Sequence, residues 1–246
     1  MKRILLLLTL VPTIALADET PPDISGTWAQ LQVQTSVVTI PIAGDITSTT
    51  VALLRVEIAQ NNKKLTVRTT PCAVDVDSEI DMVKTVIPQS TLAAIGTQQF
   101  RARLTQSERG WMFYQPPVMQ TLGVKLDNAW KDAMPSDPKD KRLIDADNDG
   151  KPGVTVKIEG AIDGAIYVAQ RSWSRLEGLV SGARIKGSLQ WQTDQSVLDA
   201  TSALLSTPPR ARPSNVPSEN YFRAIRIAPD ASCEDILKIP RDAFTF

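Results

Sequence analysis

The chain has 246 residues, of which 42% are hydrophobic and 22% are charged, so it is long enough to bury a sizeable core. Its 27 basic and 27 acidic side chains cancel, which argues against nucleic acid or an anionic membrane surface as a partner. The sequence contains no histidine, and this excludes Ser-His-Asp and Cys-His catalysis as well as histidine-ligated metal centres.

Residues 1–17 have the three-part pattern of a secretory signal peptide. Lys2 and Arg3 form a basic start, an apolar run covers residues 4–11, and Ala15 and Ala17 are the small residues that precede a cut after Ala17. We therefore expect residues 18–246 to form a single exported domain, periplasmic or secreted. A membrane span needs about 20 apolar residues, and no later stretch approaches that length.

The chain contains two cysteines, Cys72 and Cys233, and whether they pair depends on the compartment in which the protein resides. In an oxidising compartment their pairing is the default, and two buried free thiols are the alternative. A disulfide would join positions 161 residues apart, so the first third of the chain would lie against its C-terminal end.

Most segments of the chain alternate hydrophobic and polar residues with period two, which is typical of strands. The predicted strands cover residues 27–40, 51–59, 65–76, 80–87, 98–105, 111–119, 154–158, 165–177, 183–194 and 221–227. Turn residues at 60–64, 108–110 and 178–182 predict hairpins. In the segment 183–194, Ile185, Leu189 and Trp191 share one side, as expected of a sheet wall that faces a core.

Three short segments predict helices: residues 88–95, with Ser90 as a cap and Gly96 as the end, residues 197–205, and a few residues after Cys233. A proline-rich segment at 207–217 predicts a stiff linker or lid. Strands and helices do not alternate as in parallel α/β folds. The fold class is therefore mainly β, as an antiparallel β-barrel or a compact sandwich with two or three short helices.

An aspartate-rich loop at 127–153 contains Asp145, Asp147, Asp149 and Gly150, which match the opening D-x-[DN]-x-[DN]-G of a calcium loop. Hard oxygen ligands favour Ca2+, and the turn at Gly150 brings the backbone carbonyl of Lys151 toward the carboxylates. Val156 stands where a calcium loop of the EF-hand type has a bidentate glutamate.

These residues resemble the DxDxDG loops of thrombospondin type 3 repeats and dockerins. The resemblance covers about a dozen residues and implies a structural Ca2+ ion but no activity. Glu159 is our candidate for a further ligand, with Asp163, Asp140 and Asp137 as alternatives. The competing interpretation is an aspartate-rich turn whose side chains cap their own backbone.

Gly26, Thr27 and Trp28 open the first predicted strand. They are similar to the G-x-W motif of lipocalins. The resemblance implies an antiparallel barrel whose tryptophan closes one end beneath an arginine of the last strand, here Arg223 or Arg226. It also implies an apolar small molecule in the mouth of the barrel. The alternative is that Trp28 is an ordinary core residue.

These features predict an exported, soluble β-barrel protein that binds a small apolar ligand and uses a calcium loop for structure. Binding ranks above catalysis, because histidine and any nucleophile motif are missing. A periplasmic glycoside hydrolase with paired carboxylates is an alternative function, and a structural or adhesion module is another.

Overall fold

The computed structural model of the chain describes residues 20–40, 44–79, 83–207 and 210–246. The expected signal peptide, residues 1–17, lies outside the described residues. The strands are β1 (Gly26–Ile40), β2 (Gly44–Asn61), β3 (Lys64–Ser78), β4 (Val83–Val86), β5 (Gln98–Ser107), β6 (Gly110–Leu122), β7 (Val154–Gly160), β8 (Gly164–Ser181), β9 (Arg184–Ala200), β10 (Arg210–Pro213) and β11 (Tyr221–Arg226). The helical elements are α1 (Gln89–Ile95), α2 (Cys233–Leu237) and the 3-10 turns η1 (Ala203–Leu205), η2 (Pro217–Glu219) and η3 (Arg241–Phe244).

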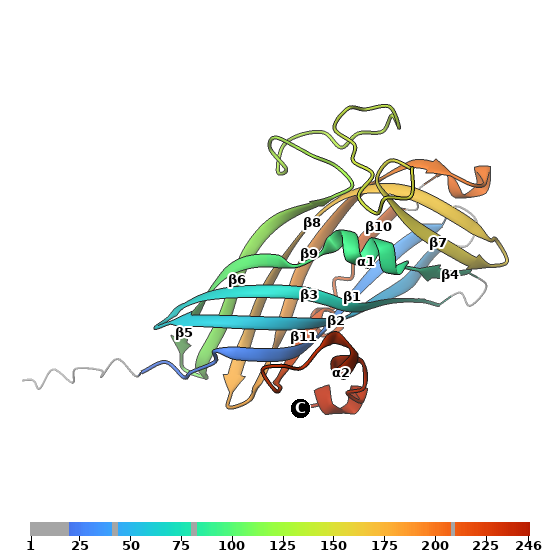
Figure 1. Ribbon diagram of the computed structural model, residues 1–246. Coiled ribbons are helices and arrows are strands. Elements are labelled where there is room, and N and C mark those ends of the chain that lie inside the picture. Colours follow the sequence, from blue (N-terminus) through green and yellow to red (C-terminus); the bar gives the residue numbers. More distant parts are fainter. Residues whose placement is uncertain (1–19, 41–43, 80–82, 208–209) are drawn as a thin grey trace, which may run out of the picture.

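Antiparallel pairing closes most of these strands into a ring (Figure 1). Each strand is hydrogen-bonded to the next in the order β1, β2, β3, β5, β6, β8, β9 and β11, and β11 returns to β1. β10 lies beside β1, while β4 and β7 connect the far end of β3 to β8. The predicted class, mainly antiparallel β with a few short helices, is confirmed, and the ring is barrel-like.

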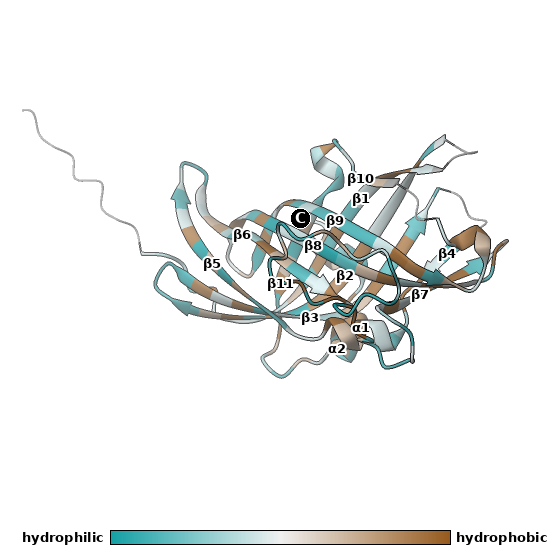
Figure 2. Cartoon of the chain, turned by 90° about the horizontal axis from the view of Figure 1, so that it is seen from above, coloured by the Kyte–Doolittle hydropathy of each residue, from teal (hydrophilic) through white to brown (hydrophobic). Residues whose placement is uncertain are grey.

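Along each strand, successive side chains point alternately into the ring and away from it. On β1, Trp28 points into the ring, whereas Ala29, Leu31 and Val33 point outward and pack beneath the C-terminal segment. On β9, Ile185 and Leu189 are buried and Trp191 is half-buried, while Arg184, Lys186, Gln190 and Gln192 between them are exposed, as the sequence predicted. Figure 2 shows hydrophobic and hydrophilic residues alternating along the strands.

The apolar core fills one end of the ring. Its residues lie near the β2–β3, β5–β6 and β8–β9 turns, and the rings of Phe113 and Phe222 lie 6.2 Å apart at its centre. The buried members are Ile24, Trp28, Leu54, Val56, Ile58, Leu65, Val67, Phe100, Ala102, Leu104, Phe113, Leu176, Ile185, Leu189, Phe222 and Ala224.

The C-terminal segment covers the outer face of β1, β2 and β3, and Figure 1 shows α2 beside these strands. Cys233 and Cys72 form the expected disulfide, with their Cα atoms 5.1 Å apart. Arg55 of β2 donates hydrogen bonds to the carbonyl oxygens of Ala231 and Pro229, at 2.7 and 3.3 Å. The end of the chain is therefore fastened to the ring by covalent and polar contacts as well as by apolar packing.

Two predictions on β8 and β9 are wrong. The predicted helix at 197–205 is strand as far as Ala200, followed only by η1, because Val197 pairs with β8 and Leu198 packs against its outer face. The predicted turn at 178–182 is shorter, since β8 continues to Ser181. Gly178 lies within the strand, where a Cβ atom would come within 2.6 Å of the ring of Phe222.

The short elements also differ in detail from their predictions. α1 ends at Gly96 as predicted, but Ser90 is not its cap and no side chain caps its first turn. Within the proline-rich segment predicted at 207–217, residues 210–213 form β10 on the edge of β1 and residues 217–219 form η2, whereas residues 208–209 lie outside the described residues. Within the described ranges no helix has the length and apolar character needed to cross a membrane.

Candidate metal centre

The long connection between β6 and β7, residues 123–153, lies against the outer face of β8 (Figure 1). Its apolar contacts with the ring form a cluster of Val124, Leu126, Met134 and Leu143 with Ala169 and Leu198. Gly153 lies so close to β8 that a Cβ atom would be 2.3 Å from the carbonyl oxygen of Val168. The aspartate-rich loop predicted at 127–153 is thus docked on the ring.

Two arginines order the outer part of this loop. Arg142 donates hydrogen bonds from Nε and Nη2 to Asp140, at 3.0 and 2.7 Å. Arg171 of β8 donates to the carbonyl oxygens of Ala129 and Asp132, at 3.3 and 2.5 Å. The first contact shapes the loop, and the second binds it to the sheet.

The pKa of Asp140 provides a test of this loop conformation. Hydrogen bonds from the side chain and then the backbone of Arg142 lower that pKa from 3.8 to about 2. Because the folded-state pKa is the lower one, the contact is complete above about pH 4 and is lost as the pH falls toward 2. An NMR titration of the Asp140 carboxyl carbon should give a midpoint near 2, and Arg142→Gln should return it toward 3.8. An ordinary midpoint in the unmodified protein would contradict the contact.

Three carboxylates meet at the inner end of the loop. Asp145, Asp147 and Asp149 each place a carboxylate oxygen within 4.8 Å of the others. Asp145 accepts hydrogen bonds from the backbone N–H groups of Asp149 and Gly150, at 3.1 and 2.9 Å. Gly150 has a φ of 83°, a conformation that glycine adopts readily and that reverses the chain here.

Asp147 is the buried member of this group. Its residue is 8% exposed, whereas Asp145 and Asp149 are exposed. Its Oδ2 accepts a hydrogen bond from the N–H of Thr155 at 2.8 Å and lies 3.3 Å from Oγ1 of Thr91. Its Oδ1 is buried and has no hydrogen-bond partner among the described residues. A buried carboxylate oxygen without a partner is costly, and a cation beside it would remove that cost.

The two threonines were missed by sequence reasoning. The hydroxyl of Thr155 donates to Asp149, and the hydroxyl of Thr91 lies 2.7 Å from the carbonyl oxygen of Thr155. Thr155 follows the motif closely enough to be a candidate, but Thr91 precedes Asp147 by 56 residues and no local pattern marks it. Through Thr91, α1 is tied to the carboxylate group.

Among the other predicted ligands, the carboxylate of Glu159 lies elsewhere. Glu159 is an exposed residue of β7, four positions beyond Thr155 and therefore about 13 Å farther along the strand. It is not a member of the carboxylate group. The ammonium of Lys151 points toward β8 and β9, at 3.6 Å from Asp199 and 5.0 Å from the ring centroid of Tyr167.

The G-x-W residues lie at the filled end of the ring. Trp28 is fully buried, and the guanidinium of Arg226 lies over its ring, 4.9 Å from the centroid. Arg226 also donates to the carbonyl oxygens of Asp23 and Ser25, each at 2.7 Å. Arg223 is directed to the outer face instead, near Phe246. A tryptophan therefore lies beneath an arginine of the last ring strand, and that arginine is Arg226.

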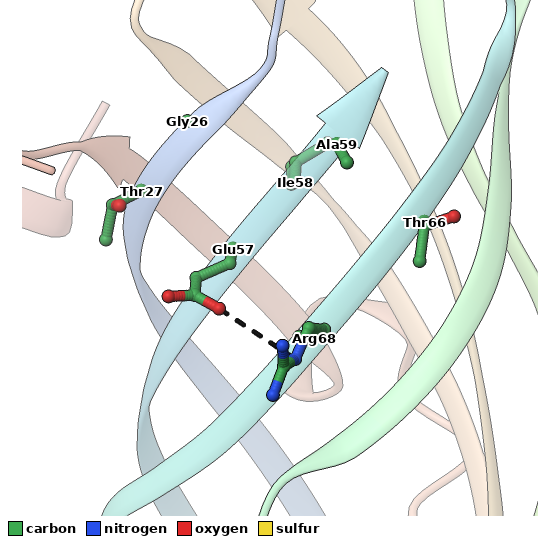
Figure 3. A pocket seen from close by; sticks show the side chains of 7 residues that line it. All are labelled: Gly26, Thr27, Glu57, Ile58, Ala59, Thr66 and Arg68. Atoms are coloured by element: carbon green, nitrogen blue, oxygen red, sulfur yellow. Dashed lines mark ion pairs between the residues drawn. The ribbon is translucent and has the colours of Figure 1, made fainter. Parts of the chain in front are cut away.

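A recess of about 280 Å³ opens between β1, β2 and β3 (Figure 3). Its one carboxylate, Glu57, lies 3.9 Å from Nε of Arg68 and receives a 2.6 Å hydrogen bond from Arg55. The hydrogen bond from Arg55 lowers the pKa of Glu57, so this group stays ionised at neutral pH. A recess with a single ionised carboxylate does not provide the acid and base that glycoside hydrolysis requires.

Comparison with known proteins finds no family model that matches this sequence and no matching curated protein. The geometry of the carboxylate group and of the ring is therefore the basis for assigning a function.

Proposed function

We propose that this protein is an exported ligand-binding protein that holds one Ca2+ ion between Asp145, Asp147 and Asp149. In this proposal the ion is structural: it fixes the connection between β6 and β7 against β8, while the ring holds a small ligand. The carbonyl of Lys151 and water would complete the oxygen ligands, and a role for Glu159 stays a prediction.

The observation that carries the proposal is the buried, unpartnered Oδ1 of Asp147. Two further carboxylates lie within 4.8 Å of this side chain, and three negative charges so close together repel one another. Burial of Asp147 prevents water from relieving that repulsion fully. A divalent cation would supply the missing partner of Oδ1 and neutralise the group.

The chemistry of the donors favours Ca2+ over other metals. All of the candidate ligands are hard oxygen atoms, with no thiolate or imidazole among them. Ca2+ accepts six to eight such oxygens in a flexible geometry, whereas Mg2+ requires a stricter octahedron and keeps more of its water. A turn with several carboxylate and carbonyl oxygens suits the larger ion.

Export is supported by two independent features. The first 17 residues have the pattern of a cleavable signal peptide. The disulfide between Cys72 and Cys233 would persist in an oxidising compartment such as the periplasm or the extracellular space.

Urea unfolding with Ca2+ and with a chelator tests the metal assignment. At a Ca2+ concentration one hundred times the Kd, the free energy of unfolding should rise by about 2.7 kcal/mol, because the ion binds only the folded state. Asp147→Asn should abolish this increment. In chelator the same variant should be as stable as the unmodified protein or more so, because it removes a buried charge.

Asp137→Asn is the matched control. Asp137 was an alternative ligand in the sequence analysis, but in the structure it lies outside the carboxylate group and accepts a local hydrogen bond from the N–H of Lys139 that asparagine can also accept. This variant should keep the whole response to Ca2+. Equal stability of the unmodified protein in Ca2+ and in chelator, at matched ionic strength, would refute the proposal.

A further inference from the structure

Beyond the apolar core, the inner face of the ring carries uncharged polar side chains together with apolar ones such as Val118 and Leu122 of β6. Gln30 follows Trp28 on the inward side of β1, and Gln32 and Gln34 continue the row. On β6, Gln115 and Gln120 face the same interior, since Gln115 pairs with Leu176 of the core and Gln120 lies in register with Ser172. The neighbouring inward positions on β2, β8 and β9 include Thr50, Ala52, Ser172, Ser174, Trp191 and Thr193.

Solvent reaches this part of the inner face. Gln32, Gln34 and Gln120 point inward, yet their side chains are partly exposed. Gln30 and Gln115, which lie next to the core, are buried instead. The two buried glutamines therefore lie between the apolar core and the solvent-accessible part of the inner surface.

Among the described residues of β1, β2, β6, β8 and β9, these inward rows carry no charged side chain. The charges of β8 alternate to the outside, where Arg171 binds the long loop and Arg175 pairs with Glu177 at 2.9 Å. A lining without charge offers no counter-ion to an anionic or cationic ligand. An aliphatic ligand would remove water from the amides and hydroxyls without replacing its hydrogen bonds.

Gln30 supplies the observation that points to a ligand. Its residue is 6% exposed, and its Nε2 has no hydrogen-bond partner in the described part of the chain. The N–H groups of that amide lie beside the polar inner face, so an oxygen acceptor bound there would satisfy them.

Trp191, an inward residue of β9 that packs against the core, supplies a fixed aromatic plane on the same inner face. Its indole N–H donates to Oδ1 of Asn220 at 2.7 Å, and the same oxygen accepts the N–H of Thr35 at 3.0 Å. This hydrogen bond holds the indole across the junction of β1 and β9. A flat apolar surface next to neutral donors and acceptors suits a ligand with C–H faces and hydroxyl edges.

We propose that the inner face of the ring binds a neutral, hydroxyl-rich ligand of the saccharide class, with Gln30 donating to a ligand oxygen and Trp191 lying against a face of the sugar. The assignment rests on the ring being the ligand site of the proposed function. It replaces the apolar ligand expected from the sequence by a polar one.

Calorimetric titration of the calcium-saturated protein with three probes tests the ligand class: maltotriose and cellotriose as neutral saccharides, trigalacturonate as a charged one, and 1-octanol as an apolar compound. We expect at least one neutral trisaccharide to bind, at least tenfold more tightly than trigalacturonate, with a change in tryptophan fluorescence. Binding of 1-octanol alone, preference for trigalacturonate, or binding of none of the probes would overturn the assignment.

Gln30→Leu should weaken the binding of the neutral saccharide about tenfold, because it removes one buried hydrogen bond. Gln192→Leu is the matched control, since Gln192 is exposed on the outward side of β9 and pairs with Trp173. Equal affinities of the two variants would count against the role of Gln30. Circular dichroism of both variants would verify that the ring is folded.

The same titration with Asp147→Asn separates this proposal from the calcium site. If the variant no longer responds to Ca2+ but still binds the saccharide, the two assignments hold independently. If the unmodified protein shows no calcium response and still binds the saccharide, only the calcium assignment fails.

Discussion

Replacing both Cys72 and Cys233 with alanine should lower the free energy of unfolding by about 4–5 kcal/mol. The disulfide closes a loop of 161 residues, and so long a closure removes much conformational entropy from the unfolded chain. The loss is an expectation of the chain-entropy model, and urea unfolding of the double variant measures it. An effect of this size is a large part of the stability of a typical domain.

Loss of the disulfide should also loosen one particular part of the structure. The C-terminal segment would then be held only by its apolar contacts, such as those of Ile236 and Phe244, and by the arginines that bridge it to the ring. Amide hydrogen exchange in α2 and η3 should therefore accelerate more than exchange in β8 and β9.

Reduction of the unmodified protein is the control for this experiment. It should reproduce the loss of stability seen in the double variant, and the double variant itself should not respond to reductant. A double variant within about 1 kcal/mol of the unmodified protein would show that the covalent closure contributes little.

Local sequence patterns predicted the strands correctly where a short turn joins two strands that pair with each other. The hairpin between β2 and β3 is an example, because Asn62 takes a φ of 54° in a turn between two alternating strands. The same holds for β5 and β6, which are separated by a turn ending at Gly110. In these cases sequence neighbours are also spatial neighbours, so the sequence pattern contains the relevant information.

Prediction failed where a distant strand decides the conformation. Residues 197–205 contain good helix formers, yet β9 continues to Ala200 because β8 lies beside it. Ser90 looked like a cap, but its neighbour Thr91 forms the important contact, with a carboxylate 56 residues away. Long-range partners of this kind leave no periodic signal in a single sequence.

In the candidate metal centre, too, the sequence predicted the residues that lie close together in the chain but not the contacts with distant elements. The three aspartates lie within five residues of one another, so their motif predicted the group that the structure brings together. The motif did not specify Glu159, which was one of several candidates for a further ligand, and the extended conformation of β7 carries it away from the group. The burial of Asp147 depends on packing against α1, which sequence spacing does not reveal.

Trp28→Ala should destabilise the protein by about 3–5 kcal/mol, because it removes a large, fully buried side chain and leaves a cavity at the end of the ring. The indole N–H donates to the carbonyl oxygen of Ile24 at 3.0 Å, and the ring supports the guanidinium of Arg226. Loss of the ring would therefore also leave a buried carbonyl without its partner. Thermal or urea unfolding measures the effect.

Two further substitutions separate the contributions of Trp28. Trp28→Phe keeps an aromatic surface beneath Arg226 but removes the indole N–H. The stability lost by this variant should therefore lie between zero and the loss of the alanine variant. Trp130→Ala is the control, because Trp130 is 54% exposed on the long loop, and its removal should change stability by no more than about 0.5 kcal/mol. If Trp28→Ala and Trp130→Ala were equally mild, Trp28 would not be the residue that closes the filled end of the ring, and the resemblance carried by residues 26–28 would lose its structural basis.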